Sequence, residues 1–337
     1  MTVSRVINDG ASVRETTRKA VQAAIRELNY EPNLAARNLV TAGELRIGVI
    51  YSNPSAAFMS DFLIGVFEEA TGAGARLILA RGENGHAPSA QELRKLLAAG
   101  VHGVVLAPPL GESVEVRDVL RAAGLPVAVV AAGRPPTDAI NVRIDDRQAS
   151  QAMTRHLLGL GHRRIGFIAG NPDQTASAER LEGARAAIAA VEGAELILAQ
   201  GTFTYGSGLR AAEWLLESDP PPTAIFASND DMAAAAVSVA HRRHLDVPRD
   251  LTVVGFDDTT VATTLWPPLT TVRQPVRQMA AVALDRLMRA LRSADPSAEA
   301  SADHVLAHAL IERESTAPPR RVTRIAGAKA PPRSSHA

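Results

Sequence analysis

The sequence of 337 residues is long enough for about two domains. Its 36 basic and 36 acidic residues cancel, which excludes a globally basic nucleic-acid coat while allowing a local basic patch. It contains no cysteine, so disulfides, thiolate metal sites and cysteine nucleophiles are excluded. Residues 1–8 contain no apolar segment of the kind that a secretory signal has, and no apolar run approaches the about 18 residues of a membrane span. We therefore expect a cytoplasmic protein with no membrane partner.

Residues 1–45 carry no β-rich run and are expected to form short helices. Residues 2–7 form one or two helical turns, which end at the turn-forming residues 8–10. A second helix covers residues 13–28, where apolar side chains follow helical spacing, and a third covers residues 34–40. Seven basic and five acidic residues in positions 1–46 predict modest DNA affinity that falls steeply with salt.

From residue 46 onward, short apolar runs alternate with helical segments. The runs are continuous rather than alternating, which is typical of parallel strands covered on both faces. Alternation of strand and helix indicates right-handed βαβ units, about four on each side of Asp145, and so two doubly wound lobes. The expected strands are 47–50, 77–80, 101–107, 127–131, 165–169, 195–198, 224–227, 252–256 and a late strand at 304–314.

The N-terminal segments Thr2-Val3-Ser4-Arg5-Val6-Ile7-Asn8, Val13-Arg14-Glu15-Thr16-Thr17-Arg18 and Leu28-Asn29-Tyr30-Glu31-Pro32-Asn33-Leu34-Ala35-Ala36-Arg37-Asn38-Leu39 occur in that order. Together they resemble the DNA-binding headpiece of the LacI/GalR family of bacterial repressors. The remainder, up to about Thr316, resembles the effector domain of that family. The resemblance implies an α/β fold: two parallel-sheet lobes of the type I periplasmic-binding-protein-like class, preceded by a truncated all-α helix-turn-helix headpiece.

The resemblance also implies boundaries. The headpiece is expected at 1–32, a hinge helix and linker at 33–45, the effector-binding and dimerisation domain at 46–316, and a disordered tail at 317–337. One lobe would combine about 46–145 with 275–300, and the other would combine 146–274 with 301–316.

The resemblance places operator contacts on the headpiece and the hinge. A recognition helix reads bases in the major groove through arginine and hydroxyl groups, and a hinge leucine wedges into the minor groove. An amphipathic helix with a solvated arginine and an ordinary linker remain the alternatives. The expected DNA-binding residues are Thr2, Ser4, Arg5, Asn8, Asn33, Ala36 and Leu39.

The sequence departs from the family pattern at its start. The first helix of the helix-turn-helix and the turn after it are missing, because the resemblance begins in register at Met1. Met1 would then be an internal methionine of a longer reading frame. For a chain that truly begins there, sequence-specific operator binding is expected to be weak or absent, because a small domain has little core to spare.

The effector is expected to bind beyond the carboxyl ends of the strands, in the cleft between the lobes. In the family, matching positions bind a small effector, often a sugar or a nucleobase. Each residue has a structural alternative: a surface ion pair for the arginine, and helix capping for the asparagine and the aspartate. Ala131 stands where many sugar-binding relatives carry an aspartate, so the identity of the sugar stays open. The expected effector-binding residues are Phe58, Arg180, Phe203, Asn229 and Asp257.

Three function classes follow from these patterns. We expect a homodimeric regulator of carbohydrate genes whose affinity for double-stranded operator DNA changes with the effector, by induction or by corepression. A solute-binding protein of the same fold would give residues 1–45 no role. An enzyme would need a nucleophile, metal or cofactor motif, and the sequence shows none, so we expect no catalytic residues, no metal and no cofactor.

Overall fold

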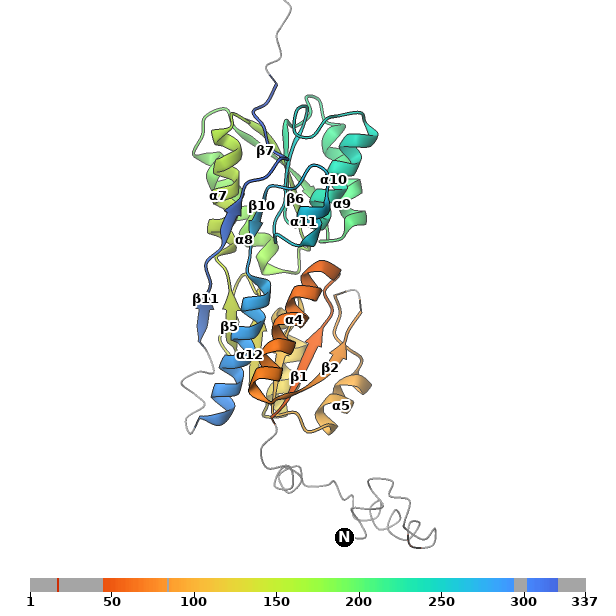
Figure 1. Cartoon of the computed structure of the whole chain (residues 1–337), viewed down its shortest axis with the longest axis vertical. Helices are drawn as coiled ribbons and strands as arrows, with labels where there is room; N and C mark the ends of the chain where they lie inside the picture. The colour runs from red at the N-terminus through yellow and green to blue at the C-terminus, as the bar shows by residue number, and fades with distance from the viewer. Residues whose placement is uncertain (1–16, 18–44, 84, 294–301, 321–337) are drawn as a thin grey trace, which may run out of the picture. The chain divides into compact units, whose positions relative to one another are not determined.

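The computed structural model describes residue 17 and residues 45–83, 85–293 and 302–320. The expected headpiece and hinge residues, the DNA-contact positions among them, lie outside this part of the chain. So does the tail from residue 321. Residues 45–320 belong to one compact unit that contains two α/β lobes (Figure 1).

The first lobe is built on a six-stranded sheet in the order β11-β5-β4-β3-β1-β2, and every pairing in it is parallel. Its strands are β1 (Arg46–Tyr51), β2 (Arg76–Arg81), β3 (Gly103–Leu106), β4 (Val127–Val130), β5 (Ile140–Arg143) and β11 (Asp303–Val305). The order places the topological switch point between β1 and β3, where a doubly wound sheet forms a crevice.

Helices cover both faces of this sheet, which explains the continuous apolar strands. One face packs against α4 (Ala56–Ala73) and α12 (Val276–Arg292), which contact each other along their length. The opposite face packs against α5 (Ala90–Ala98) and α6 (Val114–Ala122), and the short 3-10 helix η1 (Leu110–Glu112) follows β3.

The second lobe repeats the plan with a four-stranded parallel sheet in the order β7-β6-β8-β9. Its strands are β6 (Arg164–Ala169), β7 (Glu195–Gln200), β8 (Ala224–Ala227) and β9 (Thr252–Val254). Its helices are α7 (Asp146–Gly159) and α8 (Thr175–Ala189) on one face, and α9 (Tyr205–Leu216) and α10 (Asp230–Arg242) on the other. The expectation of two doubly wound parallel lobes is confirmed.

The chain passes between the lobes at three places: after β5, after β10 (Thr271–Arg273) and after β11. The single late strand expected at 304–314 is wrong. It is two short strands, because β11 pairs with β5 in the first lobe and β12 (Ala309–Ile311) pairs antiparallel with β10. The chain therefore re-enters the second lobe after Val305, and not at residue 301 as expected. The sequence patterns also did not predict β5, β10 and the short helix α11 (Thr260–Thr264).

The expected disordered tail starts too early at residue 317. The backbone oxygen of Ala317 accepts hydrogen bonds from His162 Nε2 at 2.9 Å and from Thr252 Oγ1 at 3.0 Å. Arg320 forms an ion pair with Asp250. Residues 317–320 are thus fixed to the second lobe.

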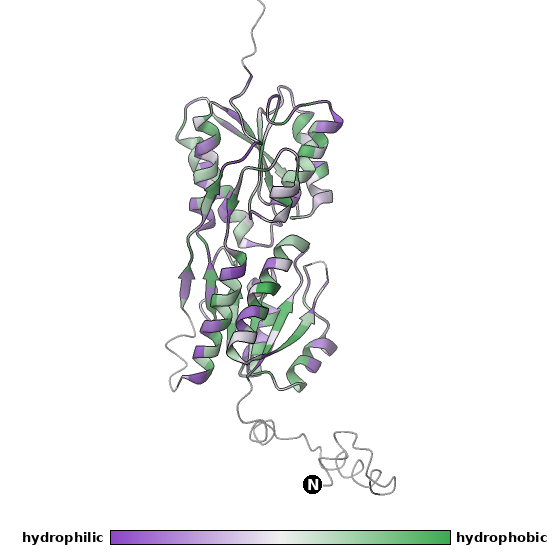
Figure 2. Ribbon diagram, viewed as in Figure 1, coloured by the Kyte–Doolittle hydropathy of each residue, from purple (hydrophilic) through white to green (hydrophobic). Residues whose placement is uncertain are grey.

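The most hydrophobic segments of the ribbon include the central strands, and the helices carry both hydrophobic and hydrophilic residues (Figure 2). One cluster of buried apolar residues extends from β1 in the first lobe to β8 in the second, so the lobes share part of their core. No helix in the described part of the chain combines the length and apolarity needed to cross a bilayer.

Candidate functional site

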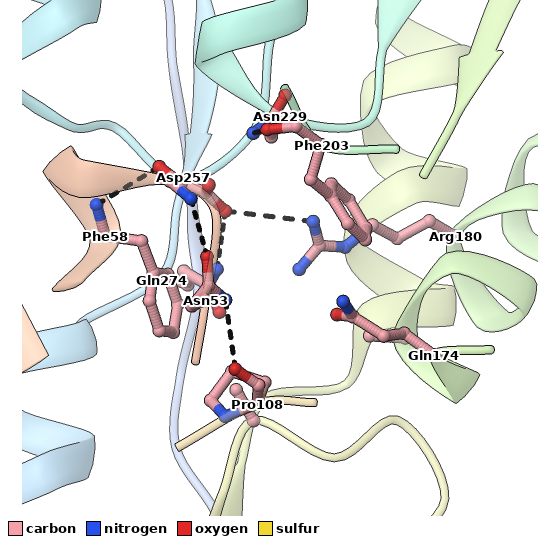
Figure 3. Close-up of a pocket in the computed structure, with 12 residues that line it drawn as sticks. Asn53, Phe58, Pro108, Gln174, Arg180, Phe203, Asn229, Asp257 and Gln274 are labelled. Carbon is pink, nitrogen blue, oxygen red and sulfur yellow. Dashed lines mark hydrogen bonds and ion pairs between the residues drawn. The ribbon is translucent and has the colours of Figure 1, made fainter. Parts of the chain in front are cut away.

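A pocket that is partly open to solvent lies between the two lobes, and the space inside it that can hold the centre of a water molecule is about 30 Å3 (Figure 3). The residues around it follow the carboxyl ends of strands, among them β1 and β3 in the first sheet and β6 and β8 in the second, between which each strand order reverses. Parallel sheets generally place their ligand sites there. The lining residues are Asn53, Ser55, Phe58, Pro108, Ala131, Gln174, Ala176, Arg180, Phe203, Asn229, Asp257 and Gln274. All five residues expected to bind the effector are therefore brought together, although their contact with an effector stays a prediction.

Arg180 is the electrostatic centre of the pocket. It projects from α8, is buried, and pairs through Nε with Asp146 Oδ1 at 2.7 Å. Its Nη1 donates to the backbone oxygen of Ser228 at 2.6 Å and lies 3.7 Å from Asp257 Oδ1. The guanidinium carbon sits 3.7 Å from the centre of the Phe256 ring, in cation–π geometry. The alternative of a surface ion pair is wrong for Arg180.

Burial disfavours the charged forms of the two carboxyl groups beside Arg180. Burial raises the pKa of Asp146, and the charge and hydrogen bond of Arg180 oppose that rise. Burial also raises the pKa of Asp257 well above its ordinary value, with Arg180 again opposing it. Because the single guanidinium is already matched by these carboxylates, this side of the pocket offers no spare positive charge to an anionic ligand.

Gln274 joins Arg180 and Asp257 in the polar wall of the pocket. The sequence patterns did not predict it as a site residue. It follows β10, is buried, and donates from Nε2 to Asp257 Oδ1 at 2.5 Å. Within the described residues, its Oε1 accepts no hydrogen bond. A buried amide oxygen without a donor is costly, so this atom marks a place where a ligand hydroxyl would be stabilised. The strand before Gln274 has three residues, too short to have signalled it from sequence.

Asn229 and Phe203 form the wall beside Arg180. Asn229 caps α10, because its Oδ1 accepts from Met232 N at 3.0 Å, and its Nδ2 donates to the Phe203 backbone oxygen at 3.0 Å. The capping alternative for Asn229 is therefore confirmed, and the residue lines the pocket as well. Phe203 fits because residue 170 is a glycine, where a Cβ would overlap the ring.

The first lobe supplies the opposite wall. Asn53 accepts from Ser55 N at 2.8 Å and donates to the backbone oxygen of Pro108 at 3.3 Å, joining the loops that follow β1 and β3. Ser55 caps α4 by accepting from Phe58 N at 3.3 Å, and the Phe58 ring is buried at the pocket. Figure 3 shows the Phe58 and Phe203 rings on opposite sides of the polar groups. The loop after β4 contributes Ala131, which has no polar atom in its side chain.

Backbone strain gathers at the same place. Five non-glycine residues in the described chain have a positive φ, and three of them line the pocket: Ala131 at 58°, Phe203 at 61° and Asp257 at 111°. Each such conformation costs on the order of 1–3 kcal/mol and persists where the surroundings enforce it, typically at functional sites. The pocket is thus preorganised at the expense of local stability. No three acidic or histidine side chains among the described residues gather closely enough to hold a metal ion.

Comparison with known proteins identifies the family. The model of the lacI family of bacterial regulatory proteins matches residues 1–33, and that of the periplasmic binding protein-like domain matches residues 154–316. The transcriptional regulator CelR of Thermobifida fusca is 38% identical over 301 residues, covering 85% of this chain and 87% of CelR. The chain belongs to the LacI family of transcriptional regulators.

Other members of the family are similar to this chain over nearly its whole length. Catabolite control protein A of Priestia megaterium is 32% identical over 291 residues, covering 86% of this chain and 87% of that protein. The structure of a CelR–cellobiose complex matches with a TM-score of 0.71 at 33% identity, covering 93% of this chain and 94% of that one. The lac repressor dimer bound to operator and the anti-inducer ONPF matches with a TM-score of 0.71 at 26% identity, covering 94% of each chain.

Membership settles the choice among the three function classes. A DNA-binding family model at residues 1–33 favours a LacI-family DNA-binding regulator over a solute-binding protein of the same fold. It equally favours a regulator over an enzyme.

Proposed function

We propose that this LacI-family protein is a cytoplasmic repressor of carbohydrate-utilisation genes, whose affinity for operator DNA changes when a neutral sugar or sugar derivative occupies the pocket between its lobes. The observation that carries the effector class is the polar wall formed by Arg180, Asp257 and Gln274. The cation there is already balanced by carboxylates, while an amide oxygen lacks a donor. Such a wall suits hydroxyl groups rather than phosphate or carboxylate.

The rings of Phe58 and Phe203 support the same class. A sugar has apolar faces of C–H groups between its hydroxyls, and an aromatic ring beside polar groups is how proteins usually grip such a molecule. In the family, the related CelR has been seen in complex with cellobiose. Cellobiose is therefore the first ligand to test on this chain.

The coupling to DNA would act through the geometry of the lobes. A ligand that contacts Asn53 on one lobe and Arg180 on the other changes the preferred angle between them, because it binds some angles better than others. Two headpieces over a near-palindromic operator would respond to that angle. Allosteric couplings of this kind are typically about 1–3 kcal/mol, or about 5- to 150-fold in affinity.

A homodimer would bring the two headpieces together. On the first lobe, Ile64 and Phe67 of α4 and Leu79 of the edge strand β2 expose 40%, 64% and 53% of their surface. Because α4 contacts β2, we infer that these side chains form one apolar patch, and a second copy of the chain is the occupant that the lac repressor dimer suggests.

Sedimentation tests the dimer. Phe67→Glu should give a monomer at micromolar concentration, because it places a charge at the most exposed of the three side chains. Val114→Glu is the control, since Val114 is 56% exposed but lies on α6, against the opposite face of the first sheet. Two dimeric variants would show that the patch is not the interface.

Calorimetric titration with cellobiose and a panel of other neutral mono- and disaccharides tests the effector class. Asp257→Asn should weaken binding at least about tenfold, because it replaces an oxygen that lines the pocket with an amide NH2 group that cannot accept a hydrogen bond there. Asp219→Asn changes an exposed aspartate away from the pocket and should bind as the unchanged protein does. Binding of an acidic metabolite in place of every neutral sugar would contradict the proposal.

A further inference from the structure

The first turn of α8 is held by the other lobe. Three helices of the second lobe are capped by their own preceding residue: α7 by Asp145, α9 by Thr204 and α10 by Asn229. The residue before α8, Gln174, makes no such hydrogen bond. Instead, Glu112 of η1 in the first lobe accepts from Thr175 N at 2.8 Å and from Thr175 Oγ1 at 2.9 Å.

This arrangement is a helix N-cap supplied from across the cleft. A carboxylate at a helix N-terminus satisfies free backbone N–H groups and interacts favourably with the helix dipole. Burial raises the pKa of Glu112, and the two hydrogen bonds from Thr175 oppose the rise.

A neighbouring loop of the first lobe reinforces the contact. Arg134, which follows β4, donates from its backbone nitrogen to Thr175 Oγ1 at 2.7 Å and from Nε to Glu179 at 2.7 Å. At Gly133 a Cβ would overlap the backbone nitrogen of Ala176, so glycine lets the loop reach the helix. The first turn of α8 is thus gripped by the loops that follow two adjacent strands, β3 and β4.

The gripped elements are the same ones that line the pocket. Pro108 and Ala131 belong to the loops that follow β3 and β4, while Gln174 and Arg180 belong to the start and the second turn of α8. Separation of the lobes at Glu112 would therefore move the two walls of the pocket apart.

We propose that Glu112 is a positioning residue for the effector site: its cross-lobe cap on Thr175 holds the cleft closed and sets Gln174 and Arg180 against the first lobe. The inference deepens the proposed function, because it concerns the same pocket. It requires the closed state to depend on Glu112 before any ligand binds.

Distance measurement between two spin labels tests this without effector or DNA, so its outcome is separate from that of the proposed function. The chain has no cysteine, so labels can be attached at Ala122→Cys on α6 and Ala189→Cys at the end of α8, both exposed. The parent protein should give one narrow distance distribution. Glu112→Ala should broaden it or add a second population.

Glu112→Gln is the conservative variant, and its amide oxygen can still accept from Thr175 N, so it should keep the narrow distribution. Arg134→Ala removes an ion pair whose arginine is 65% exposed and should change the distribution little. If Glu112→Ala matches the parent, or if the Gln variant opens as far as the Ala variant, the proposal is overturned.

Hydrogen exchange gives a second readout. Loss of an N-cap should speed exchange at the amides of residues 175–177 by about fivefold in Glu112→Ala, with α10 unaffected. Unchanged exchange at Thr175 would show that Glu112 does not cap the helix. Circular dichroism of each variant checks that the fold is intact.

Discussion

Replacement of Arg180 by methionine tests whether the pocket is organised around a buried cation. The variant keeps most of the side-chain volume but leaves Asp146 and Asp257, which are 3% and 6% exposed, without their positive partner. A buried carboxyl in that position takes up a proton rather than remain charged. Removal of one partner from a buried ion pair typically costs about 3–5 kcal/mol.

The pH dependence follows from the ordinary Asp pKa of 3.8. A carboxyl that must stay protonated in the folded protein costs about 1.4 kcal/mol for each pH unit above that value. In the unchanged protein the pKa of each carboxyl is already raised, so Arg180→Met adds only the cost of raising it further. That added cost applies where the parent carboxyls are ionised, so the destabilisation by Arg180→Met should shrink as the pH falls from 7 to 5.

Urea unfolding followed by circular dichroism at the two pH values measures this difference. Arg185→Met is the matched control, because Arg185 lies on the same helix but is 53% exposed and pairs only with Glu182 at 3.2 Å within the described chain. That control should stay within about 0.5 kcal/mol of the parent. A loss below about 1 kcal/mol for Arg180→Met, or an equal loss at both pH values, would refute the reasoning.

Two further predictions concern stability around the pocket. Gly170→Ala would overlap the Phe203 ring and should cost about 1–3 kcal/mol in unfolding free energy, whereas Gly206→Ala meets nothing within 4 Å and should cost nothing measurable. Thermal unfolding of both variants checks this, and equal melting temperatures would count against the close fit of the ring. Burial raises the pKa of Asp230 from 3.8 to about 7, so the stability of the folded protein falls as the pH rises from about 4 to 7. Asp230→Asn cannot ionise, so between pH 5 and 7 its melting temperature should rise relative to that of the parent. Parallel pH profiles over that range would argue against a raised pKa.

Much of the fold could be predicted because buried parallel strands have continuous runs of apolar residues. Residues 224–227 were predicted at the bounds the structure shows, and most other strands within one to three residues. The strands that escaped, β5 and β10, have four and three residues, and each lies where the chain crosses between lobes. Their strand character comes from pairing with distant segments, which no local pattern records.

Some residues of the pocket could be predicted from the sequence and others could not. Arg180, Asn229 and Asp257 could be placed because strand ends in α/β lobes meet at one edge, and the family resemblance pointed to them. Gln274 could not, since its strand was not visible in the sequence. Nor could Glu112, because its partner belongs to the other lobe and depends on how the two lobes meet.

The coupling of the pocket to DNA is tested most directly by operator affinity measured with and without saturating effector. Fluorescence anisotropy, with an operator fragment selected by the protein from genomic DNA and a sugar shown to bind by calorimetry, provides that measurement. We predict that the sugar changes the affinity at least about fivefold in the unchanged protein and that Asp257→Asn needs a far higher sugar concentration to respond. Operator affinity that stays the same at saturation, while calorimetry shows the pocket filled, would contradict the account.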